Sequence, residues 1–360
     1  MNKHDKKEIY EALQESALTY DSNQGKVQRV ITKEWDLAGH VWHIEDVTSK
    51  LIATTATLFS VKIDKLNQIS FHAIPLGKSL LQTLKTNFAA LRTHYPMHVF
   101  NPYVEEFIRQ SKASNVIEIA RIISSLRGDE ITTCTKELND FVDSIRQVGN
   151  GLEFKKTISD FSRLANKNNH STNELINAHF ARCSRMLVVR FDVGYKKAEG
   201  WPESTKDSVT YAETKKHRED LLKYLKKMPA NDAFIASVCN MEYGLDKKWH
   251  YHCLLLLDSA RLRGDVTIAR LIGEHWNTTI TKGRGLYWNC NANKNSYKCC
   301  GIGEVKHDDM EMREGLRKAV LYMTKPDYYI KLLVPGKDRK FWRTIIPKPK
   351  PNNRGRPRNP

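Results

Sequence analysis

The stretch EYGLDKKWHYHCLLLLDS, residues 242–259, places two histidines at the start of an apolar run. The run Cys253–Leu257 after an alternating polar pair predicts a buried strand. Residues i and i+2 of a strand point to the same face, so we expect His250 and His252 side by side. Such a pair is either two polar residues satisfied by hydrogen bonds or two ligands of a metal ion.

The apolar residues before this stretch predict the partner strand of a hairpin. If Tyr243 faces Trp249 across the loop GLDKK, which is centred on Asp246, Glu242 faces His250. Directly opposed residues share a face of the sheet, so Glu242, His250 and His252 would converge. Two imidazoles and one carboxylate with open coordination positions indicate a catalytic metal site. The alternative is a polar edge on an RNA-recognition-like sheet.

The surrounding sequence predicts an α+β domain over residues 184–335. We expect strands at 186–195, 233–244, 249–258 and 285–291, and helices at 208–228, 265–276 and 308–325. The order β-α-β-β-α-β is the ferredoxin-like pattern, with a four- to five-stranded antiparallel sheet and helices on one face. The other face of the sheet would then be free to form a site.

The preceding residues, 1–183, predict a mainly α-helical domain. Apolar residues recur there at helical spacing, and Asn101-Pro102 and Asn150-Gly151 indicate breaks between helices. The hypotheses for this domain are recognition of duplex origin DNA and binding of a host partner. Its near-neutral charge favours the partner.

Charge separates the two halves of the chain. Residues 1–180 carry 22 Lys+Arg against 21 Asp+Glu, and residues 181–360 carry the remaining 36 against 20, a net charge of +16. A basic half of this size predicts a polyanionic partner, and nucleic acid is the expected one.

Several classes of protein are disfavoured by the sequence. No stretch approaches 18 apolar residues, which argues against a membrane span. No phosphate-binding loop is found, so we expect no nucleotide cofactor. Seven cysteines without repeated spacing argue against a disulfide framework and favour a reducing, cytoplasmic location. Cys290, Cys299, Cys300 and His307 match no zinc-finger spacing.

The helix expected at 308–325 supplies a candidate nucleophile. Met312, Leu316, Ala319, Val320 and Met323 form its packing stripe, and Tyr322 and Lys325 lie on an adjoining face. A tyrosine beside a cation and a metal-bound phosphate can attack phosphorus and form a covalent intermediate. A structural role in the core is the simpler alternative for a tyrosine at a helix boundary.

A His-x-His strand followed by a helical Tyr-x-x-Lys resembles the HUH endonuclease superfamily, and most of all the inovirus-type rolling-circle replication initiators of filamentous phages, prophages and phage satellites. The resemblance covers roughly residues 185–335. It implies that Glu242, His250 and His252 bind Mg²⁺ or Mn²⁺, that Tyr322 is the nucleophile and that Lys325 is its partner. The chain departs from the initiators with two tyrosines in one helix turn, because Tyr328 and Tyr329 lie beyond Pro326. We therefore expect a single catalytic tyrosine, and a second nucleophile at Tyr328 or Tyr329 is the alternative.

The implied activity is site-specific nicking and rejoining of single-stranded DNA to initiate rolling-circle replication in a bacterial host cell. The expected partners are single-stranded DNA, duplex origin DNA and a host helicase. A relaxase or single-strand transposase of the same chemistry and a non-catalytic DNA-binding regulator are the alternatives. We also expect Lys247 and Lys248 to contact DNA.

Residues 336–360 are expected to form a basic, Pro-rich tail, and its last stretch, residues 346–360, a disordered arm. Its sequence Arg354-Gly355-Arg356-Pro357 resembles an AT-hook, whose arginines bind a narrow A·T minor groove. A generic basic tail that adds only phosphate contacts is the alternative. Either way, Arg354 and Arg356 are expected to bind DNA.

Overall fold

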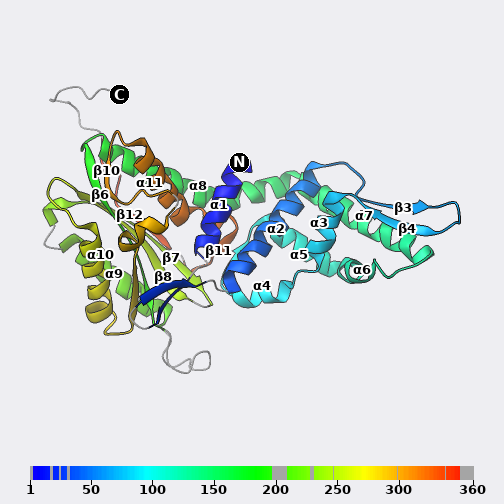
Figure 1. Ribbon diagram of the computed structural model, residues 1–360, viewed down its shortest axis with the longest axis horizontal. Helices are drawn as coiled ribbons and strands as arrows, with labels where there is room; N and C mark the ends of the chain where they lie inside the picture. The colour runs from blue at the N-terminus through cyan, green and yellow to red at the C-terminus, as the bar shows by residue number, and fades with distance from the viewer. Residues whose placement is uncertain are drawn as a thin grey trace. The chain divides into compact units, whose positions relative to one another are not determined.

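The chain folds into two compact units in a computed structural model (Figure 1). The structure describes residues 3–16, 19–23, 26–30, 33–196, 209–227, 231–245, 247–297, 299–336 and 338–348. The helical unit comprises Met1–Asn166, Gly244–Asp246 and Lys325–Lys337, and the sheet unit comprises Lys167–Tyr243, Lys247–Thr324 and Asp338–Pro360. The division falls within helix α8 (Leu152–Phe180), upstream of the boundary expected at 183/184. None of the described helices is long and apolar enough to cross a membrane.

The described residues of the helical unit are mainly α-helical and include three short two-stranded sheets. Its helices are α1 (Lys3–Ser16), α2 (Lys33–Ala53), α3 (Pro75–Leu84), α4 (Phe88–His94), α5 (Pro102–Ala113), α6 (Val116–Ile122), α7 (Asp129–Asn150) and the first part of α8. The sheets pair β1 (Thr19–Asn23) with β2 (Lys26–Val30), β3 (Phe59–Ile63) with β4 (Ile69–Ala73), and β5 (His98–Phe100) with β11 (Ile330–Leu332). Strand β11 comes from the far end of the chain.

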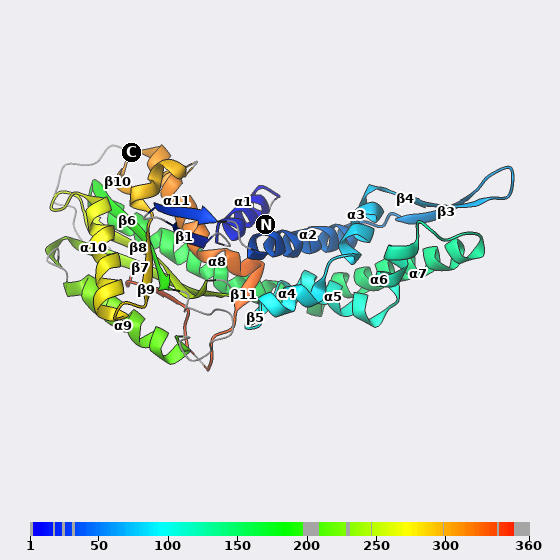
Figure 2. The same cartoon turned by 60° about the horizontal axis from the view of Figure 1, so that its bottom comes forward.

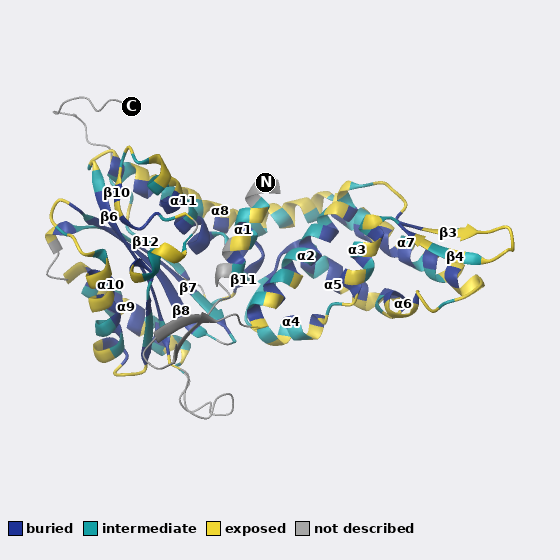
Figure 3. Ribbon diagram, in the orientation of Figure 1, coloured by how far each residue is buried: buried dark blue, intermediate teal, exposed yellow. Residues whose placement is uncertain are grey.

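Local sequence sets the helix ends that were predicted in this unit. The Asn101 side chain accepts a hydrogen bond from the Tyr103 amide, and Pro102 opens α5, as its fixed φ favours. Helix α7 ends at Asn150, and Gly151 caps it. Helices α2, α5 and α7 contact one another around a buried core that includes Ile44, Leu51, Phe107, Leu138 and Ile145 (Figure 3).

The sheet unit follows the predicted order of elements closely. Its elements are β6 (Arg185–Tyr195), α9 (Tyr211–Lys227), β7 (Phe234–Gly244), β8 (Lys248–Asp258), α10 (Asp265–His275), β9 (Gly285–Asn289), β10 (Gly303–Lys306), α11 (Met310–Thr324) and β12 (Phe341–Arg343), with short helical turns η1 (Asn231–Ala233), η2 (Trp276–Ile280) and η3 (Asn291–Ser296). The first six of the main elements give the predicted β-α-β-β-α-β pattern. The α+β class is therefore confirmed.

One sheet organises this unit. Its strands lie in the order β10-β6-β8-β7-β12, and β9 also pairs with β6. Strands β9 and β10 are both antiparallel to β6, β9 beside residues 191–195 and β10 beside residues 185–188. The described sheet thus has six strands, and the expected count of four to five was wrong. Strands β10 and β12 span only four and three residues, too few to show an alternating pattern in sequence.

Alternation along the two central strands separates the faces of the sheet. Val193 and Tyr251 lie opposite each other on one face, and the Tyr251 hydroxyl donates to the Thr214 carbonyl of α9. Helix α10 contacts β6 as well, and Figure 2 shows α9 and α10 alongside the sheet. Asp192 and His252 are paired in register on the other face, where Tyr322 of α11 lies against His252. The candidate site therefore lies on the face away from α9 and α10.

Helix α11 is held by a close backbone approach. A Cβ at Gly301 would lie 1.8 Å from the Leu316 amide nitrogen, and a Cβ at Gly315 would lie 2.1 Å from the Cys300 carbonyl oxygen. Only glycine fits at either position, so the loop before β10 packs directly on the helix. In the predicted packing stripe Leu316, Ala319, Val320 and Met323 are buried, and Met312 is half-buried. This packing fixes the segment that carries Tyr322.

Candidate metal and tyrosine site

Glu242, His250 and His252 come together at one end of the β7–β8 hairpin. Each residue offers one ligand atom, and these atoms all lie within 4.8 Å of one another. Glu242 Oε2 is 3.6 Å from His250 Nε2 and 3.3 Å from His252 Nε2. The predicted convergence is therefore present, and this group could hold a metal ion. Among the described residues it is the one such group, and the four residues Cys290, Cys299, Cys300 and His307 do not form another.

The hydrogen bonding of these side chains suits a cation. The Lys248 carbonyl accepts from His250 Nδ1 at 2.9 Å, which turns Nε2 toward Glu242. Both Nε2 atoms are buried, and neither makes a hydrogen bond of acceptable geometry within the described residues. Asn240 donates to the second carboxylate oxygen of Glu242 at 3.2 Å. Two ligand nitrogens and one carboxylate oxygen are thus oriented inward by backbone and side-chain partners.

Asp192 is a member of the site that the sequence reasoning missed. It lies opposite His252 in the β6–β8 pairing, and its Oδ1 is 2.8 Å from His252 Nδ1. Carboxylates that hold the second nitrogen of a ligating histidine fix the ring and its tautomer. The available signal was the polar residue Asp192 within the apolar strand MLVVRFDV, but its partner is a strand about 60 residues away.

The electrostatics of the group favour positive charge at its centre. Burial opposes ionisation of Glu242, but the charge of His252 and the nearness of both histidines outweigh it and hold the pKa of Glu242 well below its usual range. Burial lowers the pKa of His250. Burial also disfavours charge on His252, yet Asp192 and Glu242 together raise the pKa of His252 to about 9. The two carboxylates would stabilise either a proton or a metal cation there.

Tyr322 lies directly beside the group of Glu242, His250 and His252. Its ring and that of His252 are 5.4 Å apart between centroids and meet edge to face at 86°. The Arg190 guanidinium carbon lies 4.2 Å from the Tyr322 ring centroid. Near the end of the helix, Asn169 of α8 donates to the Thr324 hydroxyl at 3.0 Å. The structure therefore brings the predicted nucleophile and the predicted metal ligands together.

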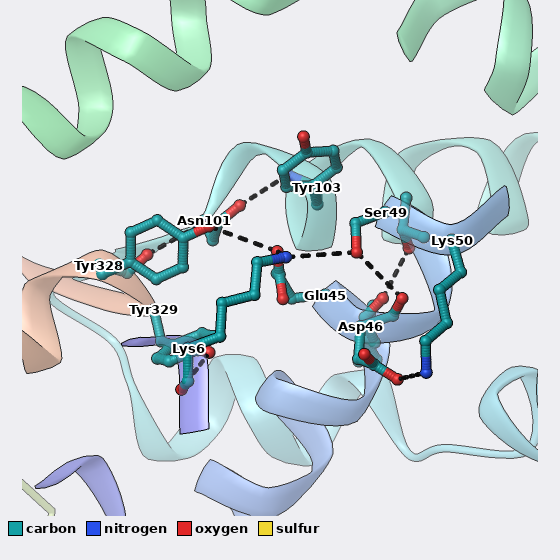
Figure 4. A network of polar contacts seen from close by, with 11 residues as sticks. Lys6, Glu45, Asp46, Ser49, Lys50, Asn101, Tyr103, Tyr328 and Tyr329 are labelled. Carbon is teal, nitrogen blue, oxygen red and sulfur yellow. Dashed lines mark hydrogen bonds and ion pairs between the residues drawn. The ribbon is translucent and has the colours of Figure 1, made fainter. Parts of the chain in front are cut away.

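The residues after α11 belong to the helical unit. The Lys325 ammonium donates to Asn166 Oδ1, so this predicted partner of Tyr322 has a partner of its own, and its catalytic role stays a prediction. Tyr328 donates to Glu45 Oε1 at 3.4 Å, and Tyr329 donates to the Lys6 carbonyl at 3.2 Å (Figure 4). Both tyrosines are buried in this network.

The DNA contacts expected of Lys247, Lys248, Arg354 and Arg356 stay predictions. Lys247 and Lys248 are half-buried at the start of β8, and the Lys248 ammonium lies 5.7 Å from the Tyr243 ring centroid. The loop residue Asp246 lies outside the described residues, as do Arg354 and Arg356 of the basic tail.

Comparison of the chain with protein-family models, curated proteins and solved structures returns no match.

Proposed function

We propose that this protein is a metal-dependent DNA nickase and strand transferase of the HUH type, in which Tyr322 forms a 5′-phosphotyrosine. The observation that carries the proposal is the contact between the Tyr322 ring and His252, one of three side chains that converge as metal ligands. The two features were expected from separate sequence motifs about 70 residues apart. Their meeting on one face of one sheet supports a common chemical role.

The fold and charge support the same class. The β-α-β-β-α-β order with α9 and α10 on one face is ferredoxin-like, and the candidate site lies on the other face, where Tyr322 of α11 contacts His252. The basic half of the chain, with its net charge of +16, suits binding of a DNA backbone. Rolling-circle initiation would follow, because nicking leaves a free 3′-hydroxyl for a polymerase. A host helicase would be needed, since no nucleotide-binding loop occurs in the sequence.

The residues of the site have distinct tasks in this mechanism. Glu242, His250 and His252 would hold the ion, and Asp192 keeps the His252 ring in place. Bound Mg²⁺ or Mn²⁺ supplies charge neutralisation and polarisation of the scissile phosphate. The Tyr322 oxygen bonds to phosphorus as the P–O3′ bond breaks. The phenolic proton is lost, and the departing 3′ oxygen takes up a proton. The ester keeps the bond energy, so rejoining needs no ATP.

The test is formation of a covalent adduct with single-stranded DNA. A library of random sequence, labelled at its 3′ end, is incubated with the protein and Mn²⁺ and separated under denaturing conditions. We expect labelled protein from the wild type and none from Tyr322→Phe or after addition of EDTA. Sequencing of the attached DNA would then give the nick site.

A relaxase or single-strand transposase would give the same adduct, and the recovered sequence would separate these alternatives from an initiator. A non-catalytic DNA-binding regulator on the same scaffold would bind the library without any covalent product. Failure of the wild type to form an adduct in Mn²⁺ and in Mg²⁺ would contradict the proposed enzyme.

A further inference from the structure

Arg190 is a buried cation beside Tyr322 on the face of the sheet that carries the metal group. It lies on β6 two residues before Asp192 and is 6% exposed. Its guanidinium carbon is 4.2 Å from the Tyr322 ring centroid and 5.7 Å from that of Tyr297. The strand is fixed at this point, because Asn291 accepts a hydrogen bond from the Arg190 amide at 2.8 Å.

The guanidinium forms no ion pair with a carboxylate of the described residues, although the charge of Asp192 acts on it from a longer distance and helps to raise the pKa of Arg190. No carboxylate of the described chain lies within ion-pair distance of it, and its Nε is buried without a hydrogen-bond partner. Asp192, the nearest acid along the strand, is 2.8 Å from His252 instead. A buried guanidinium that no carboxylate contacts, and whose Nε makes no hydrogen bond, recovers only part of the cost of its desolvation, so this arrangement needs an explanation.

Arg218 shows how the same unit treats a buried arginine with a structural role. It is 7% exposed and stacks on Trp342, with its guanidinium carbon 3.9 Å from the ring centroid. Its Nη2 is 3.3 Å from Glu219 Oε1, so it has a carboxylate partner. Arg190 has the same burial and the same ring stacking but lacks that partner.

We infer that Arg190 forms a phosphate-binding site, and that it holds a non-bridging oxygen of the DNA phosphate that Tyr322 attacks. The inference rests on the proposed function. A guanidinium presents its donors in a fixed fork that matches phosphate oxygens. Stacking on the Tyr322 ring sets the plane of that fork, and the phosphate would supply a counter-charge in direct contact with it. After attack, the same contact would hold the phosphotyrosine.

The experiment compares Arg190→Met with Arg218→Met. Methionine keeps much of the apolar volume and removes the charge, and replacing buried charged groups by apolar side chains of similar volume is often neutral or stabilising. Binding of a labelled single-stranded oligonucleotide of mixed sequence is measured against salt concentration in EDTA, so that no metal contributes. Both substitutions are also made in a Tyr322→Phe background, which keeps the ring and prevents cleavage. Thermal unfolding of each variant is recorded in parallel.

For Arg190→Met we expect an unchanged or higher unfolding midpoint. We also expect a salt slope, log K against log[salt], that is smaller by about 0.7, the value of one lost phosphate contact on a single strand. For Arg218→Met we expect a lower midpoint and an unchanged slope. An Arg190→Met variant that keeps the wild-type slope, or that fails to fold, would overturn the inference, because each outcome assigns Arg190 a structural role.

This outcome is separable from that of the proposed function. If the wild type forms no adduct but Arg190→Met has a smaller salt slope than the wild type, the nickase is refuted and the phosphate-binding site is supported. If the wild type forms the adduct and Arg190→Met keeps the wild-type slope, the nickase is supported and the phosphate-binding site is refuted.

Discussion

Two regions of this chain, six residues apart, place tyrosines in opposite electrostatic settings. Tyr322, near the end of α11, packs against His252 and lies beneath the Arg190 guanidinium. Tyr328, in the turn η4 (Pro326–Tyr328), faces the buried carboxylate Glu45. Burial and the charge of Glu45 raise the pKa of Tyr328, and the same two causes raise the pKa of Tyr329.

The difference shows what makes a tyrosine a candidate nucleophile. A phenolate and a phosphate are both negative, so attack on phosphorus needs cations and a metal site nearby. Tyr322 lies beside Arg190 and beside a group that could hold a metal ion, whereas Tyr328 and Tyr329 are buried in the interior of the helical unit. Proximity in sequence to Lys325 therefore says little about which tyrosine reacts.

The largest expected effect comes from removing single hydroxyl groups on the two sides of this comparison. Tyr322→Phe should reduce the rate of adduct formation by at least about 10³-fold, because no other group can form the phosphoester. Tyr328→Phe and Tyr329→Phe are matched controls and should form the adduct. The denaturing-gel assay with 3′-labelled DNA measures all three. An active Tyr322→Phe enzyme would break the comparison.

Removing a metal ligand should be nearly as severe. His252→Ala removes one of the three candidate metal ligands and leaves Asp192 buried without the ring it contacts. We therefore expect loss of Mn²⁺ binding and of DNA cleavage. Calorimetric titration with Mn²⁺ checks the first and the adduct assay the second. His275→Ala, a histidine of α10 on the other face of the sheet, serves as the control. Cleavage that survives both His252→Ala and excess EDTA would rule out the metal mechanism.

Asp192→Asn should have an intermediate effect. The amide keeps the shape of the side chain but weakens its hold on His252 Nδ1, and such changes typically cost about 10–100-fold in metal affinity. Higher Mn²⁺ should restore part of the cleavage activity. Asp338→Asn, which alters the ion pair with Lys215 at the protein surface, is the control. Equal Mn²⁺ affinity in the two variants would show that Asp192 does not support the ligand.

Much of the site could be predicted because it is local. The β7–β8 hairpin needs only a short connection, so the register of two neighbouring strands was enough to bring Glu242 to the histidines. The helix boundaries at Pro102 and Asn150 also follow from local chemistry.

The remainder depends on pairing between distant segments. Asp192 and Arg190 join the site through β6, and nothing within β6 identifies β8 as its neighbour. Tyr328 and Tyr329 enter the helical unit because β11 pairs with β5, more than 200 residues earlier in the chain. Strand β11 has only three residues, which is too short to carry a periodic signal.

The smallest effect should come from Glu45, the anion that separates the two tyrosine settings. Burial raises the pKa of Glu45 above its ordinary value of 4.5, although Lys6 at 2.7 Å opposes the shift. Stability from this group is therefore fully present below pH 4.5 and is lost as the pH rises through the folded-state value. The glutamine of Glu45→Gln does not titrate, so the unfolding midpoint of this variant should rise relative to that of the wild type as the pH increases from 4.5 to neutrality. A constant difference across this range would contradict the assignment.

The most direct measurement locates the DNA on the wild-type protein. Trypsin leaves Tyr322, Tyr328 and Tyr329 on one peptide, because it does not cut before Pro326. A protease that cuts before aspartate instead separates Asp309–Pro326, whose one tyrosine is Tyr322, from the peptide that begins at Asp327. Mass spectrometry of the nuclease-trimmed adduct should find the nucleotide on the first peptide. A nucleotide on the second peptide would contradict the assignment of Tyr322 as the nucleophile.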